Sequence, residues 1–494
     1  MEQMSVALRV RPLLPVERER GENESITVLP GGKRVQIITH LSRSTQNQVQ
    51  HFDMDCCLGP EVDQKGVFRA TGIVDMCNAA FEGRAATVMC FGQTGSGKTY
   101  TMSGHTEDES GVVAGDGIQF AAVRYIAKLR DQLMAMDKNA SKTVTLRASY
   151  MELFNEHIND LLSGNEGLKC RWSRDANSFF VEDLMVVECL NIDDLLLVLR
   201  EGQMRRKRAE HLLNADSSRS HVLFTTYVEV IEGDRPARHG KLTFVDLAGS
   251  ERLRDTGSQG DDSKSINRSL FALGNVIEKL SKGRSPNQKD HIPYRSSVLT
   301  QLLMDSLDGG CRTLLVACVT PSSRFVEESM RTIHFAQRTR NIRSQPVERV
   351  DATQQELYNL KMEIRRLQNE NALLRRALDL PESGSLDFNM LQKNDRLPLT
   401  TSVVSVPTHV SPVRALSSGE QNSVQQVSKS ESISQVSCNS EPTPRLTALD
   451  ILDKLPSSSG LVARQRPLPL ERSAVLPTGL GFHVVSKKNK LFGL

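Results

Sequence analysis

The sequence has little net charge, few aromatic residues and no long apolar run. Its 494 residues hold 62 lysines and arginines against 59 aspartates and glutamates, a formal net charge of +3. Such a small surplus gives no global field that would attract nucleic acid, although a local basic face is compatible with it. No stretch approaches 18 consecutive apolar residues, and no basic region followed by an apolar one opens the chain. We therefore expect a cytoplasmic protein that neither inserts into a membrane nor binds nucleic acid.

Paired cysteines are also missing. The nine cysteines are scattered; Cys56 and Cys57 are adjacent, and none belongs to a C-x-x-C pair. That spacing indicates neither a zinc site nor a disulfide framework, so reduced thiols are the simplest interpretation.

Apolar residues are unevenly distributed along the chain. They are dense up to about residue 342, periodic near 357–378 and sparse afterwards, where Ser, Pro, Val, Thr and Gln dominate. This pattern predicts one large folded domain, followed by a helical stalk and a disordered tail.

The folded part contains a phosphate-binding signature. An apolar run over 86–91 is typical of a buried strand and leads directly into the pattern G-x-x-x-x-G-K-[ST]. Its glycines let successive backbone N–H groups point at phosphate oxygens, its lysine reaches the β- and γ-phosphates, and its last hydroxyl binds Mg²⁺. The residues are Gly92, Gln93, Thr94, Gly95, Ser96, Gly97, Lys98 and Thr99. A glycine-rich turn with no ligand is the alternative, and the strand before the pattern argues against it.

Two further segments suit the same chemistry. The predicted strand 241–246 ends in Asp246, and P-loop enzymes place a metal-binding carboxylate at such a strand end. Gly249 would let a backbone N–H approach the γ-phosphate closely. Earlier in the chain, N-A-D-S-S-R-S-H contains Ser217, Ser218 and Arg219, and adjacent hydroxyls can contact a metal, a water and a phosphate. Taken singly, the segment that ends in Asp246 would also suit an ordinary strand end with a turn, and N-A-D-S-S-R-S-H would also suit a polar loop.

In this order, the phosphate loop, N-x-x-S-S-R-S-H and D-L-A-G-S-E resemble the kinesin superfamily. Further similar segments are R-V-R-P over 9–12, Y-M-E-L-F-N-E over 150–156, S-I-N-R-S-L over 265–270, H-I-P-Y-R over 291–295 and F-A-Q-R over 335–338. The resemblance covers about residues 5–346. Within the superfamily, the stretches 68–72 and 145–150 look most like kinesin family member twelve.

The resemblance implies an α/β fold, namely a P-loop NTPase motor domain over 1–342 whose central, mostly parallel sheet is flanked by helices. A neck linker over 343–350 is implied next, and we expect a short coiled coil over 351–380 and a disordered tail over 381–494. The implied ligands are ATP and Mg²⁺, and the implied partner is the microtubule. A motor domain with its linker behind it is similar to the plus-end-directed members.

Residue roles around the adenine follow from the resemblance alone. R-V-R-P begins with Arg9, and its Arg11 and Pro12 would pack on the adenine. Tyr100 occupies the position of a family ring that also lies against the base.

Roles around the phosphates are implied in the same way. Ser218 and Thr99 would lie at the magnesium, and Asp246 would hold it through water. Arg219 and Glu251 would form an ion pair that closes when the γ-phosphate is present and orients the attacking water. Positioning and charge neutralisation supply most of phosphoryl-transfer catalysis, so no covalent intermediate is needed.

Cations would carry the contact with the microtubule, because the surface of tubulin is acidic. Candidates after the second switch, which is the segment D-L-A-G-S-E over 246–251, are Arg268, Lys279, Lys282, Arg284, Lys289 and Arg295. A solvated charged face is the alternative. The denser run 205–208 precedes the first switch, which is N-A-D-S-S-R-S-H over 214–221, and we interpret this run as a solvated face.

Three segments depart from the family pattern. The stretch 257–264 is about three residues shorter than the family's loop and lacks its acidic part, which normally carries the microtubule signal. Val298 and Gln301 replace two expected cations, each worth about 0.2–1 kcal/mol by analogy with surface ion pairs. Arg349 stands near the position where many members have an asparagine that latches the docked linker.

The stalk has apolar residues at spacings of three and four. Its seam residues are Leu357, Leu360, Ile364, Leu367, Asn371, Leu374 and Leu378. Asn371 falls at an a position, where a buried amide favours parallel two-stranded pairing. The seam over 357–378 is short, so we expect a weak homodimer; a helix that packs back on the motor domain is the alternative. The tail would bind an unknown cargo.

Two functions remain open from the sequence. The phosphate loop and both switches favour a microtubule-stimulated ATPase motor. The shortened loop and the two missing cations favour a nucleotide-dependent microtubule tether or adaptor with little motility.

Overall fold

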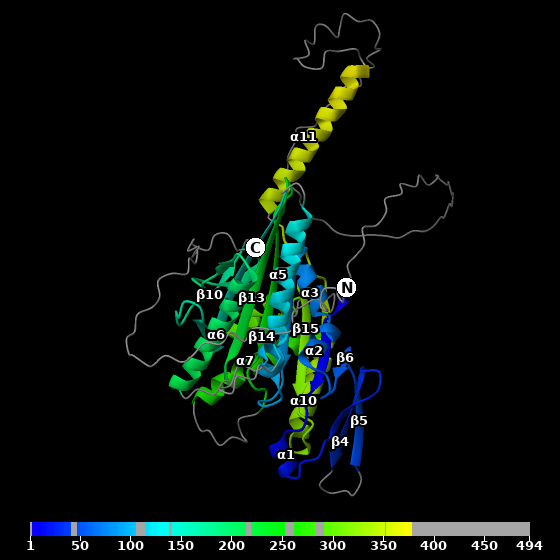
Figure 1. Cartoon of the computed structure of the whole chain (residues 1–494), viewed down its shortest axis with the longest axis vertical. Coiled ribbons are helices and arrows are strands. Elements are labelled where there is room, and N and C mark those ends of the chain that lie inside the picture. The colour runs from blue at the N-terminus through cyan, green and yellow to red at the C-terminus, as the bar shows by residue number, and fades with distance from the viewer. Residues whose placement is uncertain are drawn as a thin grey trace, which may run out of the picture. The chain divides into compact units, whose positions relative to one another are not determined.

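The structure is a computed structural model that describes residues 2–40, 47–104, 115–137, 141–174, 176–213, 219–251, 261–282, 291–350 and 352–377. Its centre is a nine-stranded sheet (Figure 1). Along the sheet the strands are β12 (Val187–Cys189), β8 (Lys142–Phe154), β13 (His221–Glu232), β14 (Arg238–Asp246), β7 (Ala85–Phe91), β15 (Arg312–Val319), β2 (Ser5–Val10) and β6 (Cys56–Leu58), with β9 (His157–Asp160) paired to β8.

The sheet is mixed rather than mostly parallel. Among the described strands, β14, β7, β15, β2 and β6 form four parallel pairs, whereas the pairs that involve β12, β8, β9 and β13 are antiparallel. The parallel half holds the predicted phosphate-loop strand. All seven residues of β7 are buried, as expected for a parallel strand that is covered on both faces.

Helices cover both faces of the sheet. One group packs together against one face, and Gly240 of β14 approaches the backbone of Ala80 on that side. This group comprises α2 (Gln64–Ala70), α3 (Ile73–Phe81), α5 (Ile118–Met136) and α6 (Ile192–Leu213). The other face packs into a continuous core with α7 (Asp261–Ser281), α8 (Val298–Leu302), α9 (Met304–Leu307) and α10 (Val326–Arg340). In this core the ring of Phe335 stacks on Phe91, with centroids 3.9 Å apart.

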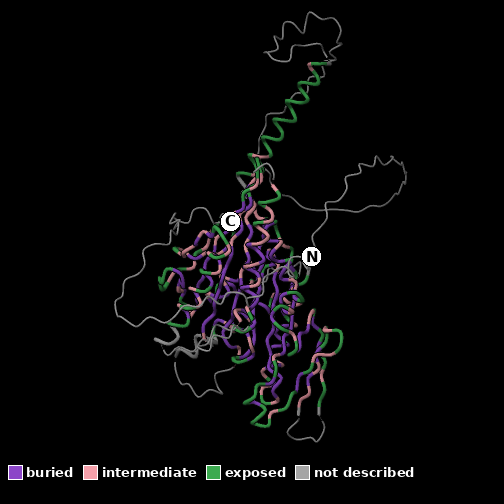
Figure 2. Tube along the Cα trace, viewed as in Figure 1, coloured by how far each residue is buried: buried purple, intermediate pink, exposed green. Residues whose placement is uncertain are grey.

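Smaller elements surround the sheet, and the buried residues are concentrated within it (Figure 2). A three-stranded sheet contains β3 (Ile26–Val28), β4 (Arg34–His40) and β5 (Asn47–Asp53), and a hairpin contains β10 (Cys170–Ser173) and β11 (Ser178–Val181). β1 (Glu2–Gln3) pairs with β16 (Arg343–Ser344). The short helices are α1 (Pro15–Glu19), α4 (Lys98–Ser103) and the 3₁₀ turns Tyr294–Ser296 and Ser323–Phe325.

The predicted stalk forms a single helix, α11 (Ala352–Ala377). The apolar seam side chains of this helix are about half exposed, from 50% for Leu367 to 56% for Leu360 and Leu374. Leu378 and the tail over 381–494 lie outside the described residues. No helix among the described segments has the length and apolar character needed to cross a membrane.

Candidate functional site

The phosphate loop turns sharply between β7 and α4. Gly92, Gly95 and Gly97 have φ angles of 152°, 74° and 95°, in the region that favours glycine. A Cβ at Gly92 would lie 2.1 Å from the carbonyl oxygen of Cys318. Only glycine fits there, and this explains why the loop can leave the strand and curl back toward α4.

Lys98 begins α4 and lies inside the curve of the loop. Its side chain is buried, and its Nζ donates to the carbonyl oxygen of Gln93 at 2.9 Å. Ser96 Oγ donates to the same oxygen at 2.8 Å. These two bonds hold the loop in a closed curve around a buried ammonium group, which is the arrangement that anion binding requires.

Thr99 and Asp246 meet beneath the loop. The Thr99 hydroxyl donates to Asp246 Oδ2 at 2.7 Å, so the end of β14 and the start of α4 converge as the motifs predict. The other carboxylate oxygen, Asp246 Oδ1, is buried and has no hydrogen-bond partner among the described residues. A buried carboxylate oxygen left without a partner is costly unless a cation or water serves it. A hydroxyl beside such a carboxylate therefore fits a Mg²⁺–nucleotide complex.

Arg206 corrects the interpretation of 205–208 as a solvated face. Arg206 is only 8% exposed, and its Nη1 lies 3.3 Å from Asp246 Oδ2. Its Nη2 donates to Ser220 Oγ at 3.4 Å, and its Nε lies 4.0 Å from Glu152. Lys207 is exposed as predicted. One member of the basic run thus belongs to the phosphate site.

The adenine-side residues divide into buried and exposed members. Arg9 is buried, donates to Thr101 Oγ1 at 2.8 Å, and lies 5.2 Å from the centroid of the Tyr100 ring. Arg11 donates to the carbonyl oxygen of Gly95 at 2.7 Å and so braces the phosphate loop. Pro12 is exposed, and Tyr100 is 38% exposed. Pro12 and Tyr100 therefore offer the accessible surface for a base, while the buried Arg9 guanidinium packs over the Tyr100 ring.

The second switch contacts the phosphate loop directly. Glu251 accepts a hydrogen bond from the Thr94 backbone N–H at 2.8 Å and another from the Thr94 hydroxyl. Gly249 lies so close that a Cβ there would be 2.4 Å from Thr94 Oγ1. Within the described residues Glu251 thus contacts Thr94 rather than Arg219. Ser217 and Ser218 fall outside the described residues.

His221 links the second switch to α7. Its Nδ1 accepts from the Ala248 N–H at 2.9 Å, and its Nε2 lies 2.8 Å from Ser269 Oγ. Burial, with the charges of Lys98 and Arg206, lowers the pKa of His221 to about 3. The ring is therefore neutral at physiological pH and carries its proton on Nε2, which donates to Ser269.

Comparisons with known proteins agree with this geometry. A family model of the kinesin motor domain matches residues 9–342. The chain belongs to the kinesin family. It is 38% identical over 390 residues to the mouse kinesin-like protein KIF12, covering 76% of this chain and 58% of that protein. It is 35% identical over 370 residues to the human chromosome-associated kinesin KIF4A, covering 74% of this chain and 28% of that protein.

A solved structure of a fast kinesin matches the fold. The TM-score is 0.62 at 31% identity, over 71% of this chain and 94% of the solved one. The kinesin fold and the resemblance to kinesin family member twelve are thus confirmed. This chain spans less than two thirds of the length of either relative.

The described candidate cations of this kinesin lie on α7, directly after its end and in the turn that precedes α8. Arg268, Lys279, Lys282 and Arg295 are exposed, whereas Arg284 and Lys289 lie outside the described residues. Lys282 is paired with Glu278 at 2.8 Å, which reduces the charge it offers.

The same face carries an aromatic side chain that sequence reasoning passed over. Phe271 on α7 is 71% exposed, three residues after Arg268. Val298, one of the two residues in place of a cation, is half-buried against the core. The face therefore combines fewer cations with an exposed ring.

The segment 343–350, predicted to be the neck linker, is held against the kinesin motor domain by backbone hydrogen bonds. After β16 pairs with β1, the Gln345 N–H donates to the Gly309 carbonyl at 2.6 Å. The Arg349 N–H donates to the Gly83 carbonyl at 2.8 Å, and the Arg349 carbonyl accepts from the His239 N–H at 3.0 Å. The linker is thus held by backbone hydrogen bonds from its start to its end.

Arg349 also holds the linker through its side chain. Its Nη2 lies 3.0 Å from Asp305 Oδ2, and Lys241 Nζ lies 3.0 Å from the same oxygen. Burial by itself would raise the pKa of Asp305, but Lys241 and Arg349 hold that pKa below its ordinary value. Arg349, which stands near the position of the family's asparagine, therefore has a charged partner in Asp305.

Proposed function

We propose that this kinesin hydrolyses ATP and uses the reaction to move along microtubules, toward the plus end. The observation that carries the proposal is the meeting of Thr99 and Asp246 at 2.7 Å beneath a closed phosphate loop. The second oxygen of this aspartate, Asp246 Oδ1, has no hydrogen-bond partner among the described residues and suits a metal-bound water. The segment 343–350 is bound to the same domain by backbone hydrogen bonds, and as a docked linker it would give nucleotide turnover a mechanical element to act on.

In the proposed mechanism this chain binds and orients the nucleotide. The loop N–H groups and Lys98 would hold the phosphates, while Thr99, Ser218 and Asp246 would hold Mg²⁺. When bound, Mg²⁺ neutralises charge on the β- and γ-phosphates as the bond breaks. Arg206 holds the Asp246 carboxylate in place, because its Nη1 lies 3.3 Å from Asp246 Oδ2.

Glu251 would act as the moving part of the switch. In the structure Glu251 contacts Thr94, a residue of the phosphate loop. This contact would be its resting position. We propose that Glu251 leaves Thr94 and pairs with Arg219 when the γ-phosphate is present, and that Gly249 then donates its N–H to that phosphate. Ser217 would orient the attacking water. Loss of the γ-phosphate would return Glu251 to Thr94.

Linker docking would convert this change into movement. The linker follows α10 and lies against Gly83 and His239 in the docked position. We propose that Arg349, through Asp305, replaces the asparagine latch and favours docking. Plus-end direction rests on the position of the linker behind the motor domain.

The remaining partners are also proposals. The exposed seam of α11 would support a weak homodimer, and the tail over 381–494 would bind an unknown cargo. The protein would act in the cytoplasm, on the microtubule cytoskeleton. Its contact with tubulin would use Arg268, Lys279 and Arg295 on the exposed face described above.

A tether with little motility is the second candidate. Half-buried Val298 and the pairing of Lys282 with Glu278 favour it, because both reduce the positive charge that faces tubulin. Each missing exposed contact is worth about 0.2–1 kcal/mol, so weaker binding rather than its loss is expected.

The steady-state ATPase rate of the full chain distinguishes the motor from the tether. It is measured with and without taxol-stabilised microtubules at low ionic strength. The motor predicts strong stimulation, and Lys98→Ala should abolish both basal and stimulated turnover. The exposed Lys207→Ala serves as a control that leaves both intact. Basal turnover unchanged by microtubules, with co-sedimentation intact, would leave the tether.

A further inference from the structure

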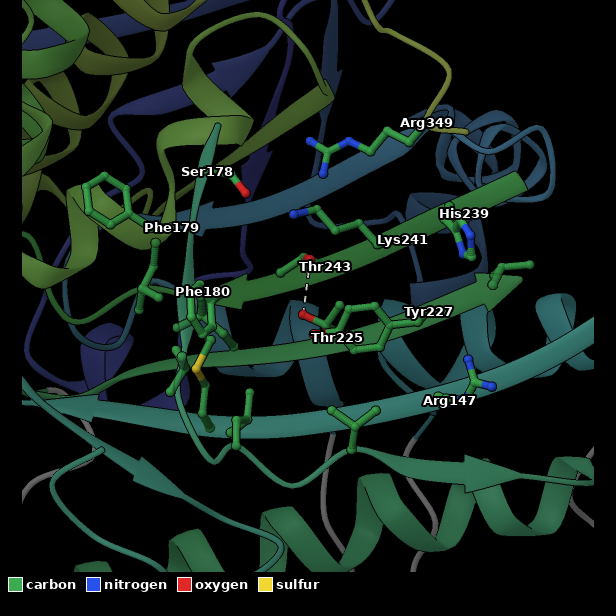
Figure 3. A pocket seen from close by; sticks show the side chains of 18 of the residues that line it. Arg147, Ser178, Phe179, Phe180, Thr225, Tyr227, His239, Lys241, Thr243 and Arg349 are labelled. Carbon is green, nitrogen blue, oxygen red and sulfur yellow. Dashed lines mark hydrogen bonds between the residues drawn. The ribbon is translucent and has the colours of Figure 1, made fainter. Parts of the chain in front are cut away.

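A cavity lies on the central sheet, and no phosphate-loop residue is among the described residues that line it. It encloses about 270 Å³ between the β10–β11 hairpin and one face of β8, β13 and β14. Side chains alternate along a strand, so Thr225 and Tyr227 of β13 and Lys241 and Thr243 of β14 share this face (Figure 3). The volume is near the lower end of the roughly 300–1,000 Å³ of ligand pockets, which suits a fragment-sized ligand.

The cavity has one apolar end. Met151, Leu223, Val181 and Leu302 line it and belong to, or pack against, the hydrophobic core, and the Phe179 ring lines it from the hairpin. An aromatic or aliphatic group would lose little by leaving water for this end.

The other end has a positively charged corner. Lys241 and Arg349 both line the cavity, and both share the single carboxylate of Asp305 behind them. One carboxylate against two cations leaves a surplus positive charge at this corner. The Ser178 hydroxyl also lines the cavity (Figure 3) and is a neutral donor. An acid group fits here, because cations and a hydroxyl can all donate to it.

The opposite corner has the reverse balance. Arg147 is paired with both Glu229 and Glu188, at 3.0 and 3.3 Å. Two carboxylates against one cation disfavour an anion there, so the acid of a ligand has one preferred position.

Docking of the linker completes the acid-binding corner. Arg349 belongs to the linker, and its position depends on the backbone bonds to Gly83 and His239. We propose that this cavity binds a fragment-sized aryl carboxylate, with its acid on Lys241 and Arg349 and its ring at the apolar end. Because the docked linker supplies one of the two cations, such a ligand favours docking, and docking favours the ligand.

The test uses 6-fluoro-2-naphthoate as the probe and its carboxamide as the neutral match. Binding to the full chain is followed by ¹⁹F NMR of the probe, without nucleotide or microtubules, so the result does not depend on motor activity. The carboxylate is expected to bind at least about fivefold more tightly than the carboxamide, because only the acid makes charge-assisted hydrogen bonds. Equal affinity of the two compounds would overturn the assignment of the acid-binding corner.

Two tryptophan variants locate the site. Leu184→Trp fills the cavity and should abolish binding, whereas Leu190→Trp makes the same change at a leucine that is 67% exposed and should not. Thr243→Met, which fills the cavity from the sheet, repeats the test if Leu184→Trp does not fold. Undiminished binding to a folded cavity-filling variant would place the probe elsewhere and refute the proposal.

The linker's part has its own variant. Arg349→Gln should lower the affinity for the carboxylate to that for the carboxamide and leave the carboxamide unchanged. An unchanged carboxylate affinity would show that the linker does not contribute.

Discussion

The contact between Arg349 and Asp305 offers the sharpest test of linker docking. Arg349→Ala removes one partner of an ion pair whose side chains are 21% and 13% exposed. A hydrogen bond to a charged group contributes about 1.5–3 kcal/mol. Lys241 stays beside Asp305 in the variant, so the loss should be smaller, about 1–2 kcal/mol. That is a factor of about 5–30 in the docking equilibrium.

Amide hydrogen exchange of the full chain measures this equilibrium directly. Docking protects the N–H groups of Gln345 and Val347, which donate to Gly309 and Gly310. We expect Arg349→Ala to lower their protection by about 5–30-fold. Arg343→Ala, at an exposed arginine of the same linker, should change it little.

A double-mutant cycle assigns the effect to the ion pair. In a background that carries Asp305→Asn, the further change Arg349→Ala should have a much smaller effect on protection, because its partner charge is already gone. If Arg349→Ala costs as much in that background as in the wild type, the side-chain latch contributes nothing and the backbone bonds alone hold the linker.

Three other expectations follow from buried or exposed side chains. Phe271→Ser should weaken microtubule co-sedimentation at least about fivefold and leave basal ATPase unchanged, because an exposed ring of this kind contributes about 1 kcal/mol or more to an interface. Arg206→Met should lower the free energy of unfolding by about 3–5 kcal/mol in urea titrations, since it removes the cation beside the buried Asp246 carboxylate, whereas the exposed Arg208→Met should not. The folded-state pKa of His221 is about 3, below the ordinary 6.5, so the unfolded state takes up a proton first as the pH falls. The contribution of neutral His221 to the free energy of unfolding is therefore complete above pH about 6.5 and falls by about 1.4 kcal/mol per pH unit toward pH 3. His221→Asn should flatten that part of the stability profile, and an unchanged slope would show that other groups produce it.

The sequence predicted that the phosphate loop and Asp246 meet, because local patterns encode both segments. The apolar run before Gly92 forms β7, and the run that ends in Asp246 forms β14, with the two strands adjacent and parallel. Parallel neighbours bring their carboxyl ends to one edge, so the loop and the acid had to meet. The mixed sheet was not predictable in this way, because the residues of a strand do not determine which strand it pairs with or in which direction.

Arg206 shows how a charge count misled the interpretation. The run 205–208 looks like a solvated cluster, yet α6 buries Leu195, Leu199, Gly202 and Arg206 at spacings of four, three and four. That helical stripe was visible in the sequence and could have identified one buried arginine in four basic residues. Its partner could not have been found so easily, because Asp246 lies 40 residues further on.

A route between the phosphate site and α7 exists that does not involve the shortened stretch 257–264. The His221 ring accepts from the Ala248 N–H in the second switch and donates to Ser269 on α7. Its neutral state fixes both bonds, because a protonated ring could not accept from Ala248. A shift of the second switch would therefore have to move His221 or break a buried hydrogen bond, at a cost of about 1–3 kcal/mol. The short loop is thus compatible with coupling between nucleotide and microtubule, since Ser269 lies on the same helix as Arg268 and Phe271.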